Sequence, residues 1–393
     1  MAKETGDLST DDLFKLVERD MSKAFKEHSG ARLSEYRKDV PKLWYSTGVP
    51  TLDVVLAGGL AGGRASEWYG ANNSGKSTIL YSSIAEAQRR HPEGFHDFHI
   101  IADPENSSTD AKEHMERLGV DTSKVYIIAP SGGKAMYAED IFDRIEELLT
   151  MSILVGRIGI IGIDSVGALV SKEEGDKSWD KSARVGGIAP VLGRFLGRTI
   201  DNGLLQNSMG HMMLLNQIRD NIGDVWNPTR TAGGNKLKHV VSQRVEVSRT
   251  LGQDFRNSKY NSNSDNCPEA QFIGQKIRFK QTKSKVGGKM GATASVDFYY
   301  EQGLDIMLNI IQLAQNYDII VGSGWMTFID YATGQEIFKK QGFSNMKQVF
   351  VDDEEAYMKL DYMLTMVMRG LEPKSVVDEW EDIKKEEFEG EGK

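Results

Sequence analysis

The segment Gly70–Ser77 reads GANNSGKS and carries the strongest structural signal in the chain. It matches the pattern G-x-x-x-x-G-K-[ST], in which glycines let consecutive backbone N–H groups face a phosphate. The apolar run before it predicts a strand, and the pattern after it predicts a helix whose N-terminus attracts anions. The residues that we expect to hold a nucleotide are Gly70, Ala71, Asn72, Asn73, Ser74, Gly75, Lys76, Ser77 and Thr78.

The expected reaction site also needs charges and metal ligands beside this loop. Lys76 would hold the β- and γ-phosphate oxygens, and Ser77 would ligate Mg²⁺. The apolar run Ile158–Ile163 ends in Asp164, and a carboxylate at that strand end can meet the same Mg²⁺ through a water molecule. Glu105 closely follows another apolar run and is the expected general base that orients the attacking water. Together these residues predict ATP and Mg²⁺ as the bound groups.

Short apolar runs alternate with helical patterns from Trp44 to about Phe328, which is typical of a mostly parallel α/β sheet flanked by helices. Residues 141–149 show one such helical pattern. Later alternating runs, at 244–248, 276–280 and 296–300, predict antiparallel strands added to one edge. Central strands are predicted at Ala65–Tyr69, Phe98–Ala102, Val125–Ala129, Ile158–Ile163 and Met212–Gln217.

Composition limits the classes of function. The chain has 393 residues, 39% of them hydrophobic, and a net charge of −9, which fits an ordinary globular protein. That charge argues against coating nucleic acid through the overall field, so any DNA site must be local. The sequence shows neither a spanning helix nor a secretory signal, and Cys267 is its single cysteine, which excludes an intrachain disulfide. We therefore expect a cytoplasmic protein with no membrane partner.

Two segments fit neither a strand nor a helix. Lys172–Gly187 and Arg219–Gly234 read as long loops, and such loops in a compact domain are usually functional or disordered. The C-terminal segment Glu372–Lys393 holds nine acidic and four basic residues, and its composition predicts disorder. Around Trp325–Phe338 the pattern indicates a hairpin, followed by helices.

With these motifs in place, the chain resembles the RecA recombinase family. The resemblance covers roughly residues 15 to 330 and follows one order along the chain. After about Phe338 the sequence departs from the family pattern, which suits a version encoded by a bacteriophage. The stretches that carry the resemblance are Met21–Phe25, Ala31–Leu33, Ser46–Gly48, Gly62–Arg64, Glu67–Gly70, Leu118–Asp121, Asp164–Val166, Ala168–Val170, Asn216–Arg219, Asn227–Pro228 and Gly233–Lys238.

The resemblance implies a P-loop NTPase core of the RecA type and an order of domains. Residues 1–43 would form an N-terminal helix and strand for polymerisation, and 44–328 would form the ATPase core. The two long loops, 172–187 and 219–234, would then be the DNA-binding loops of that core. A small C-terminal domain would span 329–371, and 372–393 would be an acidic tail.

It also implies roles for individual residues. Gln217 would sense the γ-phosphate, and Lys283 and Lys285 would reach across a protomer interface to the same phosphate. Asp110 is the expected contact to adenine. His239 stands where the bacterial proteins have an aromatic interface residue, so subunit cooperativity would differ. The implied DNA contacts are Trp179, Arg184, Arg194, Arg219, Ile222, Trp226, Gly233 and Gly234.

The function that the resemblance implies is a DNA-dependent ATPase. It would form helical filaments on single-stranded DNA and exchange that strand into homologous double-stranded DNA, with single-strand-binding and loading proteins as further partners. One alternative is a hexameric replicative helicase, against which the loop at Gly233 and the N-terminal element argue. A second alternative is a nucleotide-gated DNA filament protein that does not hydrolyse ATP. Glu105 argues against the second alternative, because a binding switch needs no general base.

Overall fold

The computed structural model describes Lys15 and residues 43–91, 94–132, 135–175, 187–220, 229–251 and 272–384. The chain divides into two compact units, Met1–Leu43 and Trp44–Lys393. The helix and strand expected for polymerisation, within 1–43, lie outside the described residues except for Lys15 and Leu43. All elements named below belong to the second unit.

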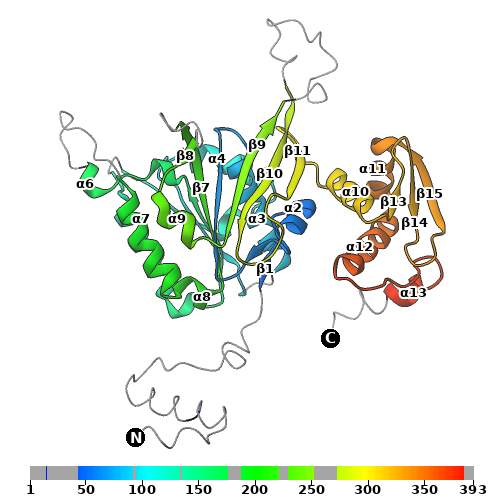
Figure 1. Cartoon of the computed structure of the whole chain (residues 1–393), viewed down its shortest axis with the longest axis horizontal. Coiled ribbons are helices and arrows are strands. Elements are labelled where there is room, and N and C mark those ends of the chain that lie inside the picture. Colours follow the sequence, from blue (N-terminus) through cyan, green and yellow to red (C-terminus); the bar gives the residue numbers. More distant parts are fainter. Residues whose placement is uncertain are drawn as a thin grey trace, which may run out of the picture. The chain divides into compact units, whose positions relative to one another are not determined.

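The strands form one large sheet and two small ones (Figure 1). The five predicted central strands are confirmed as β3 to β7, with bounds that shift by a few residues at most. Short apolar runs mark them because strands of a parallel sheet are buried on both faces. The strands are β1 Trp44–Tyr45, β2 Leu60–Ala61, β3 Ala65–Gly70, β4 Phe98–Ala102, β5 Val125–Ile128, β6 Ile158–Asp164, β7 His211–Asp220, β8 Thr229–Thr231, β9 Gln243–Thr250, β10 Gly274–Ser284, β11 Thr293–Tyr299, β12 Gly303–Leu304, β13 Ile320–Val321, β14 Trp325–Ile329 and β15 Glu336–Gln341.

The large sheet has the strand order β12-β11-β10-β9-β3-β7-β6-β4-β5, with β8 paired to β7. From β9 to β5 all neighbours along this path run parallel, whereas β10, β11 and β12 are antiparallel to their neighbours. One prediction was therefore wrong in part: β9, at 244–248, pairs antiparallel with β10 as expected, but it pairs parallel with β3 on its other side. Its alternating pattern indicates burial on one face and carries no information on direction.

Helices cover both faces of the central strands. Ile161 and Ile163 of β6 face a hydrophobic core shared with α5 and α7, whereas Gly162 between them lies against Leu80 of α3. Because alternate residues of a strand point to opposite faces, α3 lies on the face opposite to α5. The helices are α2 Pro50–Val55, α3 Lys76–Arg90, α4 Ser108–Arg117, α5 Ala138–Thr150, α6 Lys172–Gly175, α7 Ala189–Leu196, α8 Leu204–Ser208, α9 Gly234–Val240, α10 Ile306–Asn316, α11 Gly342–Asp352, α12 Glu354–Met368 and α13 Trp380–Ile383, with short turns η1 Thr122–Lys124, η2 Ser152–Leu154, η3 Val166–Ala168 and η4 Gly197–Asp201.

The structure describes the ends of the two predicted loops. The segment 172–187 begins with the helical turn α6, and 176–186 lie outside the described residues. In the segment 219–234, β7 continues to Asp220 and β8 returns antiparallel to it. The loop prediction was thus wrong for the two ends of this second segment, because Arg219 pairs with Arg230 in a ladder.

A second hydrophobic core lies near the C-terminus. It joins α10, the sheet β13-β14-β15 and helices α11 to α13 (Figure 1). The predicted hairpin is present as β14 and β15. This core already includes Ile311 of α10, earlier in the chain than the domain start expected at 329.

The prediction of a disordered tail from Glu372 was wrong for its first half. Val376, Trp380 and Ile383 are buried in the second core, at 0%, 5% and 1% exposure. Residues 385–393 lie outside the described part. Among the described helices, none combines the length and the apolar character that crossing a membrane requires.

Candidate functional site

The loop between β3 and α3 is shaped by two glycines. A Cβ on Gly70 would come within 1.9 Å of the Val247 carbonyl oxygen, and one on Gly75 within 2.5 Å of the Ile277 side chain. Gly75 also has φ +99°, a conformation that strongly favours glycine. No side chain in the described structure caps the first turn of α3, which begins at Lys76. Its backbone N–H groups and its helix dipole therefore fit a phosphate.

The Lys76 ammonium group folds back over this loop. Its Nζ donates to the carbonyl oxygens of Gly70, at 3.2 Å, and Ala71, at 2.8 Å, and to Ser74 Oγ at 3.5 Å. Burial lowers the pKa of Lys76, and the carboxylates of Asp164 and Glu105 act in the opposite direction. The cation thus sits among weak neutral partners, which phosphate oxygens can replace with charge-assisted hydrogen bonds.

Ser77 and Asp164, the expected Mg²⁺ ligands, meet directly. Ser77 Oγ donates a 2.5 Å hydrogen bond to Asp164 Oδ2. Burial raises the pKa of Asp164, while the hydrogen bond from Ser77 and the charge of Lys76 act in the opposite direction. A hydroxyl and one carboxylate fit Mg²⁺, because this ion keeps several waters and takes its remaining ligands from substrate phosphates.

Glu105 lies beside the same strand end. Its Oε1 accepts a 2.7 Å hydrogen bond from Ser165 Oγ, and Ser165 directly follows Asp164. Glu105 itself is exposed, so one carboxylate oxygen is fixed while solvent can reach the group. This arrangement suits a base that orients a water molecule.

Gln217 lies next to the phosphate loop. In the parallel pairing of β3 with β7, Gln217 is the register partner of Gly70. A side chain at this position can respond to what the loop binds. Two residues later Arg219 donates from Nη2 to the Gly167 carbonyl oxygen at 3.0 Å, so its guanidinium is already engaged within the protein.

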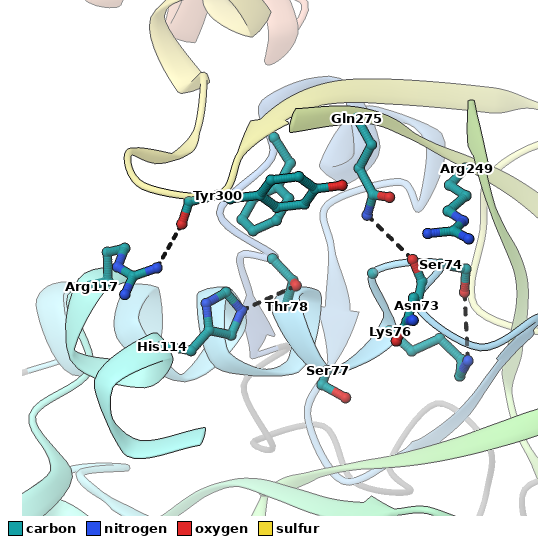
Figure 2. A pocket seen from close by; sticks show the side chains of 12 residues that line it. Asn73, Ser74, Lys76, Ser77, Thr78, His114, Arg117, Arg249, Gln275 and Tyr300 are labelled. Carbon is teal, nitrogen blue, oxygen red and sulfur yellow. Dashed lines mark hydrogen bonds between the residues drawn. The ribbon is translucent and has the colours of Figure 1, made fainter. Parts of the chain in front are cut away.

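A cavity of about 570 Å³ opens beside the loop (Figure 2). Its far wall comes from residues that the sequence did not single out. His114 Nε2 and Thr78 Oγ1 are 3.2 Å apart, and Arg117 Nη1 donates to the Tyr300 carbonyl oxygen at 2.5 Å. No motif could have indicated these side chains, because α4 and β11 meet only through the topology of the sheet. The residues of this wall are His114, Arg117, Arg249, Gln275, Phe298 and Tyr300.

This wall has the chemistry of a nucleobase site. The His114 and Phe298 rings pack edge to face with centroids 5.8 Å apart, and Tyr300 continues the aromatic surface with its centroid 5.8 Å from that of Phe298. Asp110, the residue predicted to contact adenine, belongs to α4, but its side chain lies outside the described part.

Lys283 and Lys285 lie at the end of α9 rather than at the phosphate loop of the same protomer. Lys283 Nζ donates to the carbonyl oxygens of Lys238, at 2.5 Å, and His239, at 2.9 Å. Lys285 Nζ donates to the His239 carbonyl oxygen at 2.6 Å. Cations at the C-terminal carbonyls of a helix are favourable, since they complement its dipole.

The structure places half of the predicted DNA contacts. Arg194 is exposed on α7. Gly233 has φ +90°, and a Cβ on it would lie 2.7 Å from Leu192, so packing alone already demands glycine there. Gly234 follows with φ +72° at the start of α9. Trp179, Arg184, Ile222 and Trp226 lie outside the described residues.

Comparison with known proteins agrees with this geometry. The family model described as RecA N-terminal domain matches residues 14–305. The chain belongs to the RecA family. It is 31% identical over 349 residues to Protein RecA of Halalkalibacterium halodurans, covering 87% of this chain and 88% of that protein. It is 33% identical over 294 residues to Protein RecA of Dichelobacter nodosus, covering 74% of each chain, and 29% identical over 378 residues to Protein RecA of Oceanobacillus iheyensis, covering 94% of each.

Membership in the RecA family gives the chain its general function, which is recombination and repair of DNA. The matched region includes the phosphate loop, Glu105, Asp164 and Gln217. It ends at 305, just before the second core begins with α10.

Proposed function

We propose that this RecA-family chain is a DNA-dependent ATPase that forms a helical filament on single-stranded DNA and exchanges that strand into a homologous duplex. The observation that supports this proposal most strongly is the meeting of Lys76, Ser77, Asp164 and Glu105 around one glycine loop. The proposal includes a cytoplasmic location, single-strand-binding and loading proteins as partners, and the expected domain order.

Each group at the site has a task in hydrolysis. The backbone N–H groups of the loop and Lys76 bind the phosphates and stabilise the negative charge that moves to the leaving oxygen. Mg²⁺, held by Ser77 and Asp164, would neutralise charge on the β- and γ-phosphates. Glu105 orients the attacking water and accepts its proton, and the hydrogen bond from Ser165 keeps the carboxylate in place.

Gln217 is the proposed link from the γ-phosphate to DNA. It lies beside Gly70 at the loop and on the strand that leads into the proposed second DNA-binding segment, 219–234. A change in what Gln217 touches therefore moves the root of that segment. The glycines at 233 and 234 close the segment and would offer backbone N–H groups to DNA phosphates.

The edge at which β5 ends the described part of the large sheet supports self-assembly. β5 ends the strand order, and Tyr126 and Ile127 on it are 43% and 38% exposed. Ile153 and Val155, which shortly precede β6 in the sequence, are 76% and 60% exposed. An exposed apolar edge strand is a template for pairing with another chain. We assign it to the N-terminal segment, 1–43, of a neighbouring copy.

Electron microscopy with single-stranded DNA and a slowly hydrolysed ATP analogue tests this proposal. A helical filament is expected. A closed ring would favour the hexameric helicase, and dispersed protein would contradict both. Measuring phosphate release with and without DNA tests the other alternative, a nucleotide-gated DNA filament protein that does not hydrolyse ATP. Such a protein would form filaments but show no DNA-stimulated phosphate release.

A further inference from the structure

A carboxylate is buried in the middle of the large sheet, on the strand that leads into the phosphate loop. Glu67 of β3 has a fully buried side chain, which requires charged or hydrogen-bonding partners. Arg244 of β9 donates from Nε to Glu67 Oε2 at 2.6 Å. Asn216 of β7 donates from Nδ2 to Glu67 Oε1 at 3.0 Å. Both carboxylate oxygens are thus held from the strands on either side of β3.

The Asn216 side chain joins two more segments. Its Nδ2 also donates to the Ala232 carbonyl oxygen at 2.9 Å, and its Oδ1 accepts from the Gln217 backbone N–H at 3.0 Å. Asn216 is fully buried. Gln217 is the proposed phosphate sensor, and Ala232 directly precedes Gly233. One side chain therefore connects the root of the nucleotide site with the root of the proposed DNA site.

The same network continues to the strand of the paired lysines. The Arg244 guanidinium lies 4.7 Å from the centre of the Tyr69 ring. Tyr69 Oη donates to Thr282 Oγ1 at 3.0 Å, and Thr282 Oγ1 donates to the Arg244 carbonyl oxygen at 3.2 Å. Lys283 follows Thr282 and is the register partner of Arg244. Changes at β10 therefore also reach Glu67 through fixed contacts.

We propose that Glu67 is a positioning residue that couples nucleotide binding to DNA binding. It holds the Asn216 side chain in the position where it contacts both the Gln217 backbone N–H and the Ala232 carbonyl oxygen. This inference rests on the proposed function, since it needs both ligands to bind. Buried hydrogen bonds of this kind cannot be broken singly without leaving an unsatisfied polar atom. A displacement of Gln217 is therefore passed on to residues 232–234 instead of being absorbed locally.

Coupling between the nucleotide and DNA sites can be distinguished from unfolding and from the loss of one site, because it changes both affinities by the same factor. If the nucleotide raises DNA affinity by some factor, DNA must raise nucleotide affinity by the same factor. The experiment measures this factor from both sides, with an ATP analogue that is not hydrolysed and a fluorescent single-stranded oligonucleotide. The factor commonly lies between about 5 and 150 in coupled systems.

The variant that removes the contact between Glu67 and Asn216 is Glu67→Met/Arg244→Met. It removes both charges together and leaves neither partner of the ion pair buried alone. Apolar replacement of a buried ion pair is often tolerated. Glu67→Gln is the variant that keeps the Asn216 link, because its amide oxygen can still accept from Asn216, although its NH2 group cannot accept from Arg244. Asp97→Asn is the matched control: Asp97 is a buried carboxylate that pairs with Arg157 at 2.7 Å, and these two residues directly precede β4 and β6.

We expect the coupling factor of the double-Met variant to fall to within about twofold of one from both sides, while either ligand alone binds within about threefold of the unaltered chain. Glu67→Gln and Asp97→Asn should keep most of the factor. If the double-Met variant does not fold, Asn216→Ser breaks the same link without touching the ion pair and should lose the factor too.

Three outcomes would overturn the inference. A folded double-Met or Asn216→Ser variant that retains the full factor removes Glu67 from the coupling. Loss of the factor in Asp97→Asn as well would show a general effect of weakening the sheet. A factor of one in the unaltered chain would instead contradict the proposed function, and the inference with it.

Discussion

The hydroxyl of Ser77 and the carboxylate of Asp164 share a 2.5 Å hydrogen bond across the gap between α3 and β6. Both side chains are therefore already oriented toward one point. A cation bound there would replace the hydrogen bond between them with two metal–oxygen contacts. Because burial raises the pKa of Asp164, a cation there also relieves an unfavourable charge.

We predict that Ser77→Ala raises the Mg²⁺ concentration needed for half-maximal ATP hydrolysis about tenfold, the equivalent of about 1.4 kcal/mol. The variant removes one ligand but keeps the phosphate loop and Asp164. The measurement is a Mg²⁺ titration of phosphate release on DNA. Ser83→Ala is the control, since Ser83 lies on the same helix and donates to the Ile79 carbonyl oxygen. An unchanged titration curve for Ser77→Ala would remove the hydroxyl from the metal site.

Glu105→Gln should separate binding from turnover. The amide has the shape of the carboxylate and can still accept from Ser165, but it cannot take a proton from water. We expect ATP-bound filaments that persist, with hydrolysis lowered by about 10²–10⁴. Single-turnover phosphate release and electron microscopy check the two halves of this statement. Rapid hydrolysis by the variant would show that another group acts as the base.

The strands of the large sheet were predictable for a physical reason. The run at 158–163 is apolar throughout because β6 is covered on both faces, and the glycine motif marks the end of β3. The same reasoning located Lys76, Ser77, Asp164 and Glu105, since strand ends of a parallel sheet meet at one edge. These four side chains are near neighbours in space although they are far apart in the sequence. Ser77 and Asp164, for example, share a hydrogen bond across 87 sequence positions.

Other features depend on packing that no local pattern contains. His114 and Phe298 form one wall of a pocket because α4 and β11 are brought together by the fold. The pattern of β9 predicts an antiparallel strand, and β9 does pair antiparallel with β10, but it pairs parallel with β3. Trp380 lies in an acidic stretch whose composition predicts disorder, but its ring is buried. The ammonium groups of Lys359 and Lys384 lie 5.5 Å and 6.0 Å from the centre of this ring.

Two buried histidines predict loss of stability in mild acid. Burial lowers the pKa of His99 and of His211 to about 4. Between pH 6.5 and 4 the unfolded chain binds protons that the folded chain does not, so stability is complete above pH 6.5 and falls as the pH drops through this window. Each histidine contributes up to about 1.4 kcal/mol per pH unit.

Unfolding midpoints measured from pH 7 to pH 5 check this dependence. His99→Gln removes one titrating ring and keeps an acceptor for the Ile160 N–H, which His99 Nδ1 accepts at 3.1 Å. It should therefore reduce the pH dependence. His239→Gln, at an exposed side chain, controls for the loss of an imidazole. A variant whose pH dependence equals that of the unaltered chain would exclude His99 as a source of it.

The acidic end should act on DNA through its charge, but the point of truncation matters. Residues 385–393 contain four acidic and two basic residues, and we predict that removing them strengthens duplex binding at low salt. Truncation from Glu372 should also destabilise the second core by about 3 kcal/mol or more, because Trp380 and Ile383 are buried there. Salt titrations of DNA binding and thermal unfolding of both truncations test this difference. Identical stability of the two would contradict it.

The positions of Lys283 and Lys285 bear on how subunits share a site. Both ammonium groups cap α9 in their own protomer, and the lining of the nucleotide cavity in the described structure includes neither. Burial, with Lys285 nearby, lowers the pKa of Lys283, and an anion beside this ammonium group would act in the opposite direction. A phosphate on a neighbouring protomer is such an anion, and a cation supplied in trans would stabilise charge on the transferring group.

We predict that Lys76→Ala protein and Lys283→Ala/Lys285→Ala protein, each inactive alone, recover hydrolysis when mixed on single-stranded DNA. If each filament interface pairs one protomer's phosphate loop with its neighbour's lysines, equal mixing makes about a quarter of the interfaces intact. Phosphate release near that fraction of the unaltered rate is expected, with Lys280→Ala in place of the double variant as the control for losing a β10 lysine. If the two inactive proteins co-assemble in one filament and release no phosphate, the lysines act within their own protomer, on α9 or on DNA.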